Sequence, residues 1–326
     1  MQRRQFHLLA VSAAALGLVP AAVRAADAYP SRPVRLVVGF PPGGSADINA
    51  RLVGQQLAKE LGGTLVIENK GGAGGNLAAM DIKRSPADGY NLFYGTSAVV
   101  LAPSLYSKPG FDPYTDFIPV SLTATIPLLL VASPQLPART VAELVAYGKE
   151  NPGKLNYASS GSGALLHLGG ALFTSAMGIR AEHVAYKGSA PAVADLLAGN
   201  VQFMLLPINE AMPHVRAGSI RALAITSDRR SPLVPDVPTM QEATGRKDME
   251  MGAWQGLMAP RGTPPDVIAK LASALQATLA DQDLRRKLAE QGSTVLGGTA
   301  KQYADYMKQE GARWARVVQD TGTRLD

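Results

Sequence analysis

The sequence contains no cysteine, and only 6% of its 326 residues are aromatic. The lack of cysteine excludes disulfides, thiolate catalysis, zinc–cysteine sites and iron–sulfur clusters. A chain of this length can bury a sufficient hydrophobic core without disulfides. Histidine occurs four times, and the spacing of His167, His183 and His214 shows no metal-ligand pattern. We therefore expect no metal and no cofactor.

Long apolar runs are also scarce. The mostly apolar stretch Phe6–Val19 is too short to span a bilayer comfortably, and no other stretch approaches about 18 apolar residues. It follows Arg3-Arg4 and ends at Pro20, and Val23-Arg24-Ala25 supplies small residues for a cleavage site. Residues 1–25 are therefore predicted to be a cleavable signal peptide, read by either the Sec or the twin-arginine pathway, and the mature protein to be soluble and periplasmic.

The sequence has little excess charge of either sign. Lys and Arg number 32 against 26 Asp and Glu, and cleavage of the signal would remove three arginines, leaving 29 against 26. A net charge near +3, scattered along the chain, does not favour nucleic acid or an acidic surface as a partner. The composition predicts an ordinary globular protein.

What the sequence does contain is an alternation of strand-like and helix-like segments, which predicts parallel sheets covered by helices. A Thr140…Glu143 capping box opens one of the helices. The expected strands are Val34–Phe40, Thr64–Glu68, Asn91–Gly95, Leu155–Ser159, His183–Tyr186, Val201–Leu206 and Arg221–Thr226. The expected helices are Ser45–Leu61, Thr140–Lys149, Leu165–Met177, Pro191–Ala198, one along Val267–Leu279 and a last one along Tyr303–Val317.

Two apolar runs beside prolines, Ile126–Ala132 and Ala253–Ala259, fit neither series. Taken as strands that pass between two lobes, they predict a two-lobe α/β architecture with two crossing strands. Residues 27–125 together with 255–326 would form lobe 1, and residues 126–254 would form lobe 2. A cleft between two lobes is a common place for a ligand site.

Glycine and serine are concentrated in four predicted strand-to-helix turns, where ligands bind in open α/β sheets. Glycine allows close approach of the backbone, and a helix N-terminus offers free N–H groups to an anion. Each turn alone is more often only a tight connection, but four facing one cleft would bind a carboxylate. No dinucleotide or nucleotide fingerprint is complete. The turns are Pro41–Asp47, Lys70–Asn76, Ser159–Gly163 and Tyr186–Ser189.

Several side chains near these turns allow two interpretations. Asp47 orients the first turn or simply complements the helix dipole, and His167 serves the serine-rich turn or is a packed or capping histidine. Lys187 is solvated or pairs with a ligand carboxylate, Tyr186 forms the cleft wall or packs beneath it, and Trp254 packs between the lobes or stacks on a ligand. A serine hydrolase using Ser162 and His167 is the alternative function, although no nucleophile elbow is present.

At these same turns the sequence resembles the Bug family of periplasmic receptors, the TctC-like substrate-binding proteins of tripartite tricarboxylate transporters. The resemblance covers nearly the whole mature chain, in order. The matching segments are Phe40–Asp47 with Ala50-Arg51, Glu68-Asn69, Gly72–Asn76, Pro86–Tyr90, Asp116–Val120, Ser160–Gly163 with His167-Leu168, Tyr186–Ala192 with Asp195-Leu196, Ala217-Gly218, Arg221–Ala224 and Pro235–Thr239.

The resemblance implies a Venus-flytrap fold, no catalysis, and capture of a small organic carboxylate through backbone groups, hydroxyls and bridging waters. It implies transient contact with a membrane permease, and we expect a monomer that binds no nucleic acid. A sensor subunit without a transport role is a further alternative. Carried over residue by residue, the ligand-binding positions are Gly43, Gly44, Ser45, Asp47, Ala73, Gly74, Ser160, Gly161, Ser162, Gly163, Tyr186, Lys187, Gly188 and Ser189.

The sequence departs from the family pattern at two places. Lys70-Gly71 stands where many members have Arg-Pro, and the apolar Leu205-Leu206-Pro207 stands where many have a Phe-Asp pair. These departures leave the identity of the ligand open.

Overall fold

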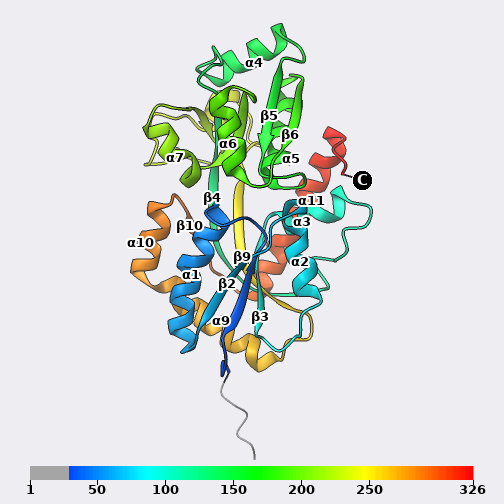
Figure 1. Cartoon of the computed structure of the whole chain (residues 1–326), viewed down its shortest axis with the longest axis vertical. Helices are drawn as coiled ribbons and strands as arrows, with labels where there is room; N and C mark the ends of the chain where they lie inside the picture. Colours follow the sequence, from blue (N-terminus) through cyan, green and yellow to red (C-terminus); the bar gives the residue numbers. More distant parts are fainter. Residues whose placement is uncertain (1–28, 326) are drawn as a thin grey trace, which may run out of the picture.

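A computed structural model describes residues 29–325 and shows two α/β lobes stacked along the long axis of the molecule (Figure 1). The predicted signal peptide lies outside the described residues. The elements are, in order, β1 (Val34–Val38), α1 (Ser45–Leu61), β2 (Leu65–Asn69), the short 3₁₀ helix η1 (Ala73–Gly75), α2 (Asn76–Lys83), β3 (Asn91–Thr96), α3 (Ala98–Leu105), β4 (Phe117–Ala132), α4 (Val141–Glu150), β5 (Leu155–Ser159), α5 (Leu165–Met177), β6 (Ala181–Ala185), α6 (Ser189–Ala198), β7 (Phe203–Pro207), α7 (Ile208–Arg216), β8 (Arg221–Ile225), α8 (Met240–Thr244), β9 (Gly252–Pro260), α9 (Pro265–Ala280), α10 (Gln282–Glu290), β10 (Thr294–Val295) and α11 (Ala300–Thr321).

The strongest sequence signals produce elements at the predicted bounds. α1 and α5 begin and end where the periodicity places them, and each ends at a glycine in the left-handed region, Gly62 and Gly178. The capping box of α4 is only half formed. The Thr140 side chain accepts the Glu143 N–H, but the Glu143 carboxylate accepts from the Arg139 N–H instead of from Thr140.

Lobe 1 is built on parallel strands β2, β1 and β3, with β9 antiparallel beside β3. Successive side chains of β1 point to opposite faces of the sheet. Val34, Leu36 and Val38 pack in the core formed with α1, α9 and α10, while Val37 packs in the core formed with α2, α3 and α11. Both faces of this sheet are therefore covered by helices, as the fold class predicts.

Lobe 2 has the parallel strands β6, β5 and β7, and β4 runs antiparallel to β7 and β8. One face packs against α4 and α5 through residues such as Leu144 and Phe173. The other face packs against α6 and α7 through residues such as Leu196 and Met212. The same architecture is thus repeated in the second lobe.

Strands β4 and β9 join the two lobes. They pair antiparallel from Phe117–Pro260 to Pro127–Gly252, so a single ten-stranded sheet runs through both lobes. The crossing strands confirm the predicted architecture, although β4 begins well before Ile126. A register shift after Pro119 accommodates this proline within the ladder. The predicted lobe boundaries fall inside these two strands and stay predictions.

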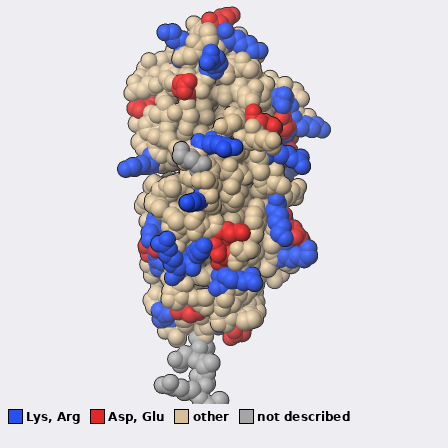
Figure 2. All heavy atoms as spheres, turned by 90° about the vertical axis from the view of Figure 1, so that its right-hand side faces the viewer, with Lys and Arg blue, Asp and Glu red and all other residues tan. Residues whose placement is uncertain are grey.

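The C-terminal helix α11 strengthens the connection between the lobes. It packs against α3 and β4 and also reaches α5 of lobe 2, at the right-hand side of Figure 1. Figure 2 shows this side of the molecule, where Lys and Arg are interspersed with Asp and Glu. None of the helices within residues 29–325 combines the length and apolarity that a bilayer span requires.

Candidate ligand-binding site

A cavity of about 650 Å³ lies between the lobes. Its wall combines the first residues of α1 in lobe 1 with the first residues of α6 in lobe 2. The β7–α7 junction, the start of α5 and the β3–α3 junction complete it. Aliphatic side chains and prolines dominate the wall. Of the described residues, three with ionisable side chains contribute to it: Lys187, Glu210 and His214.

The fourteen predicted ligand-binding residues divide into two groups. Those that line the cavity are Gly43, Gly44, Ser45, Ser160, Lys187, Gly188 and Ser189. Those that lie outside the lining are Asp47, Ala73, Gly74, Gly161, Ser162, Gly163 and Tyr186. Within the second group, hydrogen bonds and close contacts identify structural roles for Asp47, Gly74, Ser162, Gly163 and Tyr186.

Asp47 lies beneath the first glycine-rich turn and is almost fully buried. Its carboxylate accepts hydrogen bonds from the Gly43 N–H (2.9 Å), the Arg51 Nε–H (2.9 Å) and the Asn69 side-chain amide (2.9 Å). Burial raises the pKa of Asp47, but the hydrogen bonds from Arg51, Gly43 and Asn69 outweigh it and hold the pKa below its ordinary value. Asp47 thus fixes the turn, the first of its two predicted interpretations.

The second and third glycine-rich turns meet each other across the cleft. A β-carbon on Gly74 would lie 2.7 Å from the Ser162 carbonyl oxygen and 2.9 Å from the Gly163 carbonyl carbon. Gly188 approaches Pro41 in the same way, with 3.0 Å between such a β-carbon and Pro41 Cγ. The glycines at these positions allow the two lobes to touch at the rim of the cavity.

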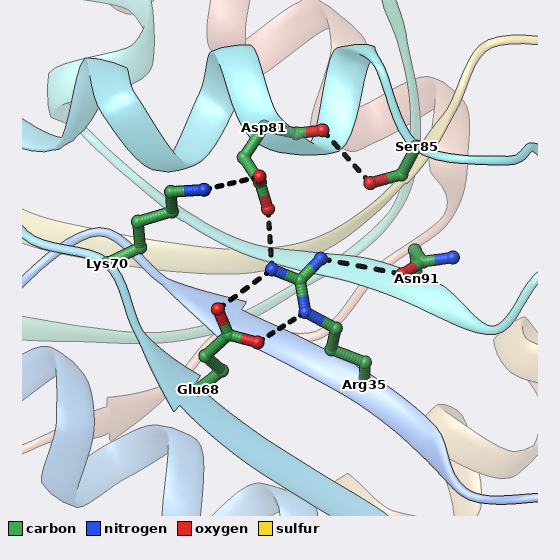
Figure 3. A network of polar contacts seen from close by, with 6 residues as sticks. All are labelled: Arg35, Glu68, Lys70, Asp81, Ser85 and Asn91. Atoms are coloured by element: carbon green, nitrogen blue, oxygen red, sulfur yellow. Dashed lines mark hydrogen bonds and ion pairs between the residues drawn. The ribbon is translucent and has the colours of Figure 1, made fainter.

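Lys70, one of the departures from the family pattern, does not line the cavity. Figure 3 shows it in a network with Asp81 of α2, Arg35 of β1 and Glu68 of β2. Lys70 Nζ lies 2.5 Å and Arg35 Nη2 lies 2.6 Å from the Asp81 carboxylate, and Arg35 also pairs with Glu68. The network anchors the start of the second glycine-rich turn.

Two aromatic residues of the sequence prediction have structural roles. The Tyr186 hydroxyl donates to Asp195 of α6 (2.5 Å), and burial together with this bond raises the pKa of Tyr186 to about 12. Trp254 is fully buried and packs edge-to-face against Tyr303 and Tyr306 of α11. The expected packing role of Trp254 is confirmed.

The histidines do not form the hydrolase pair that the alternative function requires. His167 is buried, and its Nδ1 accepts a hydrogen bond from the Gly163 N–H (3.3 Å). The serine beside a histidine is Ser159, whose Oγ lies 2.7 Å from His183 Nε2, and Ser159 is wholly buried. Within residues 29–325 no group of three or more His, Cys, Asp or Glu side chains is placed to hold a metal ion.

The sequence prediction missed the contribution of α7, which supplies Asn209, Glu210 and His214 to the cavity wall. Glu210 Oε1 accepts a hydrogen bond from the Ser45 N–H (2.7 Å). Burial raises the pKa of Glu210, and the side chains of Ser189 and Ser45 together with the Ser45 N–H oppose the rise. Within residues 29–325, the buried Asn209 Nδ2 has no hydrogen-bond partner.

Two α/β lobes, joined by crossing strands around a cavity lined by helix N-termini, define a two-lobe solute-binding protein of the periplasmic type. The chain belongs to the family of tripartite tricarboxylate transporter receptors, whose sequence profile matches residues 49–323. The members of this family are solute-binding proteins and not enzymes.

Three solved structures illustrate the similarity. The periplasmic binding protein BugD is 37% identical with a TM-score of 0.86, covering 91% of this chain and 100% of BugD. A Rhodopseudomonas palustris protein solved with adipate is 37% identical with a TM-score of 0.86, covering 90% and 98% of the two chains. MatC from Rhodopseudomonas palustris, solved with bound malate, is 36% identical with a TM-score of 0.84, covering 89% and 100%.

Proposed function

We propose that this protein is exported to the periplasm, where it captures a small organic carboxylate between its lobes and delivers it to the permease of a tripartite tricarboxylate-type transporter. The observation that carries the proposal is the pairing of two helix N-termini, α1 from lobe 1 and α6 from lobe 2, on one cavity wall. A helix N-terminus carries the positive end of the helix dipole and unpaired N–H groups, which suit an anion.

The rest of the wall supports the same ligand class. Lys187 offers a positive charge, Ser160 offers a hydroxyl, and the unpaired Asn209 amide nitrogen is a donor that a ligand oxygen would satisfy. The apolar side chains suit a short carbon skeleton. The adipate and malate of the two related structures are both small carboxylates.

In this proposal some of the predicted residues contact the ligand, and others hold the turns that form the cavity. Gly43, Gly44, Ser45, Ser160, Lys187, Gly188 and Ser189 contact the ligand. Asp47 and Tyr186 hold the turns in place, and the Gly74 contact with Ser162 and Gly163 closes the rim. A small ligand held mainly by backbone and hydroxyl groups can be released again to a permease.

The test is the melting temperature of the mature protein, unfolded and refolded to remove any bound solute, against mono-, di- and tricarboxylates, amino acids and aromatic acids. A ligand at about 100 times its dissociation constant adds about 2.7 kcal/mol to the free energy of unfolding. This raises the melting temperature by about 5 °C for a protein of this size. No shift with any organic acid at millimolar concentration would contradict the proposed receptor function.

A further inference from the structure

Among residues 29–325, Glu210 is the one acidic residue that lines the cavity. It lies in the first turn of α7 in lobe 2, yet its Oε1 is 2.7 Å from the Ser45 nitrogen at the start of α1 in lobe 1. Ser45 is the first residue of α1, so Glu210 of lobe 2 bonds to the first residue of a lobe 1 helix. Ser189, the first residue of α6, lines the same cavity.

The Ser45 N–H is one of the groups that would otherwise bind a ligand anion in the cavity. Its hydrogen already points to a carboxyl group that belongs to the protein. The first glycine-rich turn also packs closely around the Glu210 carboxyl group, since a β-carbon on Gly44 would lie 3.7 Å from Glu210 Oε1. A ligand carboxylate arriving here would have to displace Glu210 or lie beside it.

A second carboxylate beside Glu210 is unfavourable, because two like charges repel more strongly in an enclosed apolar site than in water. A cationic or hydrogen-bond-donating ligand group has the opposite effect, since the carboxyl oxygens of Glu210 accept hydrogen bonds. Lys187, Ser160 and the backbone at Gly188 also line the cavity and suit a carboxylate. Aliphatic side chains such as Leu165, Val193 and Leu197 form part of the same wall.

We propose that Glu210 is a specificity-determining residue, which makes the cavity select organic acids with one carboxylate and, at the other end, an ammonium or neutral hydrogen-bond-donating group. Dicarboxylates of the same length are selected against. This inference rests on the receptor function proposed above and narrows the ligand class within it.

The experiment uses matched ligand pairs that differ only in one terminal group. Succinate is compared with 3-aminopropanoate, adipate with 5-aminopentanoate, and terephthalate with 4-(aminomethyl)benzoate. Dissociation constants are measured by titration calorimetry on the refolded wild-type protein, on Glu210→Gln and on Glu150→Gln. Glu150 is an exposed residue at the end of α4, outside the cavity lining, so this control removes the same charge elsewhere.

The wild-type protein is expected to bind the amino acid of at least one pair about 10-fold or more tightly than its dicarboxylate partner. Glu210→Gln is expected to shift this ratio towards the dicarboxylate by about 10- to 100-fold, while Glu150→Gln leaves it unchanged. A wild-type preference for the dicarboxylates, or a ratio that Glu210→Gln does not change, overturns the inference. Because the wild-type preference is measured by itself, this test does not depend on the folding of the variant.

The broad melting panel keeps the two proposals distinguishable. A melting shift only with acids that carry two or more carboxylates would support the receptor function and overturn the selectivity assigned to Glu210. A flat response across the whole panel would overturn the receptor function, and the inference with it.

Discussion

Gly74 lies where the second glycine-rich turn of lobe 1 touches Ser162 and Gly163 of lobe 2. We predict that Gly74→Ala weakens ligand affinity by about 10-fold or more, because the added β-carbon would lie within 3 Å of backbone atoms across the cleft and would hold the lobes apart. The variant is also expected to lose about 1 kcal/mol of stability, since its φ of 63° disfavours a β-carbon. Titration calorimetry and thermal melting measure the two effects.

Gly178→Ala is the matched control for this prediction. Gly178 ends α5 with the same φ of 63°, but a β-carbon there would meet nothing within 4 Å. The control is expected to lose similar stability and to keep the wild-type affinity. Equal affinity losses in both variants would mean that backbone strain, and not the contact between lobes, explains the Gly74 effect.

Asp47 gives a second prediction at the scale of single residues. Asp47→Ala removes the acceptor for the Gly43 N–H and the Asn69 amide, and leaves these donors without their partner. We expect a loss of about 1–3 kcal/mol in the free energy of unfolding and a weaker affinity for every ligand that binds the wild-type protein. Asp47→Asn, which keeps an acceptor oxygen, is expected to lose less of both. Urea unfolding measures the loss of stability, and titration calorimetry measures the loss of affinity. Wild-type stability and affinity in both variants would contradict the prediction.

At the scale of elements, α5, β5 and β6 bring His167 and His183 together with 3.7 Å between their ring centroids. Burial lowers the pKa of His167 to about 4, and burial together with repulsion from His167 lowers the pKa of His183 to about 3. An unfolded histidine titrates near pH 6.5. Below that pH the unfolded chain binds protons that the folded chain does not, so the stability present above pH 6.5 falls as the pH drops towards 4 and 3.

We predict that the free energy of unfolding falls by about 4 kcal/mol between pH 7 and pH 5 because of this pair, with about 2 kcal/mol from each histidine. His183→Gln should lower the dependence on pH, because one of the two buried imidazoles is removed. Urea unfolding at several pH values measures this, and an unchanged dependence in His183→Gln would contradict the prediction.

The element scale also explains what the sequence could and could not predict. Helices with a clear apolar stripe, such as α1 and α5, were predicted to the residue. Helix α7 was missed, because Pro207 at its start and Pro213 within it imitate turn signals in a short segment. Glu210 was missed with it. Sequence periodicity gives no sign that its carboxyl group meets Ser45 on another lobe, since that contact exists only in the tertiary structure.

The sequence predicts where the glycine-rich turns lie but not their separate roles. Gly43, Gly44 and Ser45 line the cavity, while Gly74 and Gly163 meet across its rim. Both tasks require glycine or small residues, so the composition of a turn does not distinguish them. The distinction depends on how the two lobes are set against each other.

At the scale of the whole molecule, the ladder between β4 and β9 and the packing of α11 on both lobes couple the lobes mechanically. We predict that the mature protein unfolds in one cooperative transition in scanning calorimetry, with equal calorimetric and van't Hoff enthalpies. A bound ligand should raise the temperature of that single transition. Two separate transitions, with only one of them moved by a ligand, would contradict this prediction.

Strand β9 lies between β3 and β4 in the sheet, although it follows both by more than a hundred positions in the chain. Strands β3 and β4 therefore leave the ribosome long before β9, the strand that joins them. Helices α9, α10 and α11, which cover lobe 1, emerge later still. The first lobe to begin is thus the last to be completed, so lobe 1 cannot assemble its whole sheet and core until synthesis of the chain is almost finished.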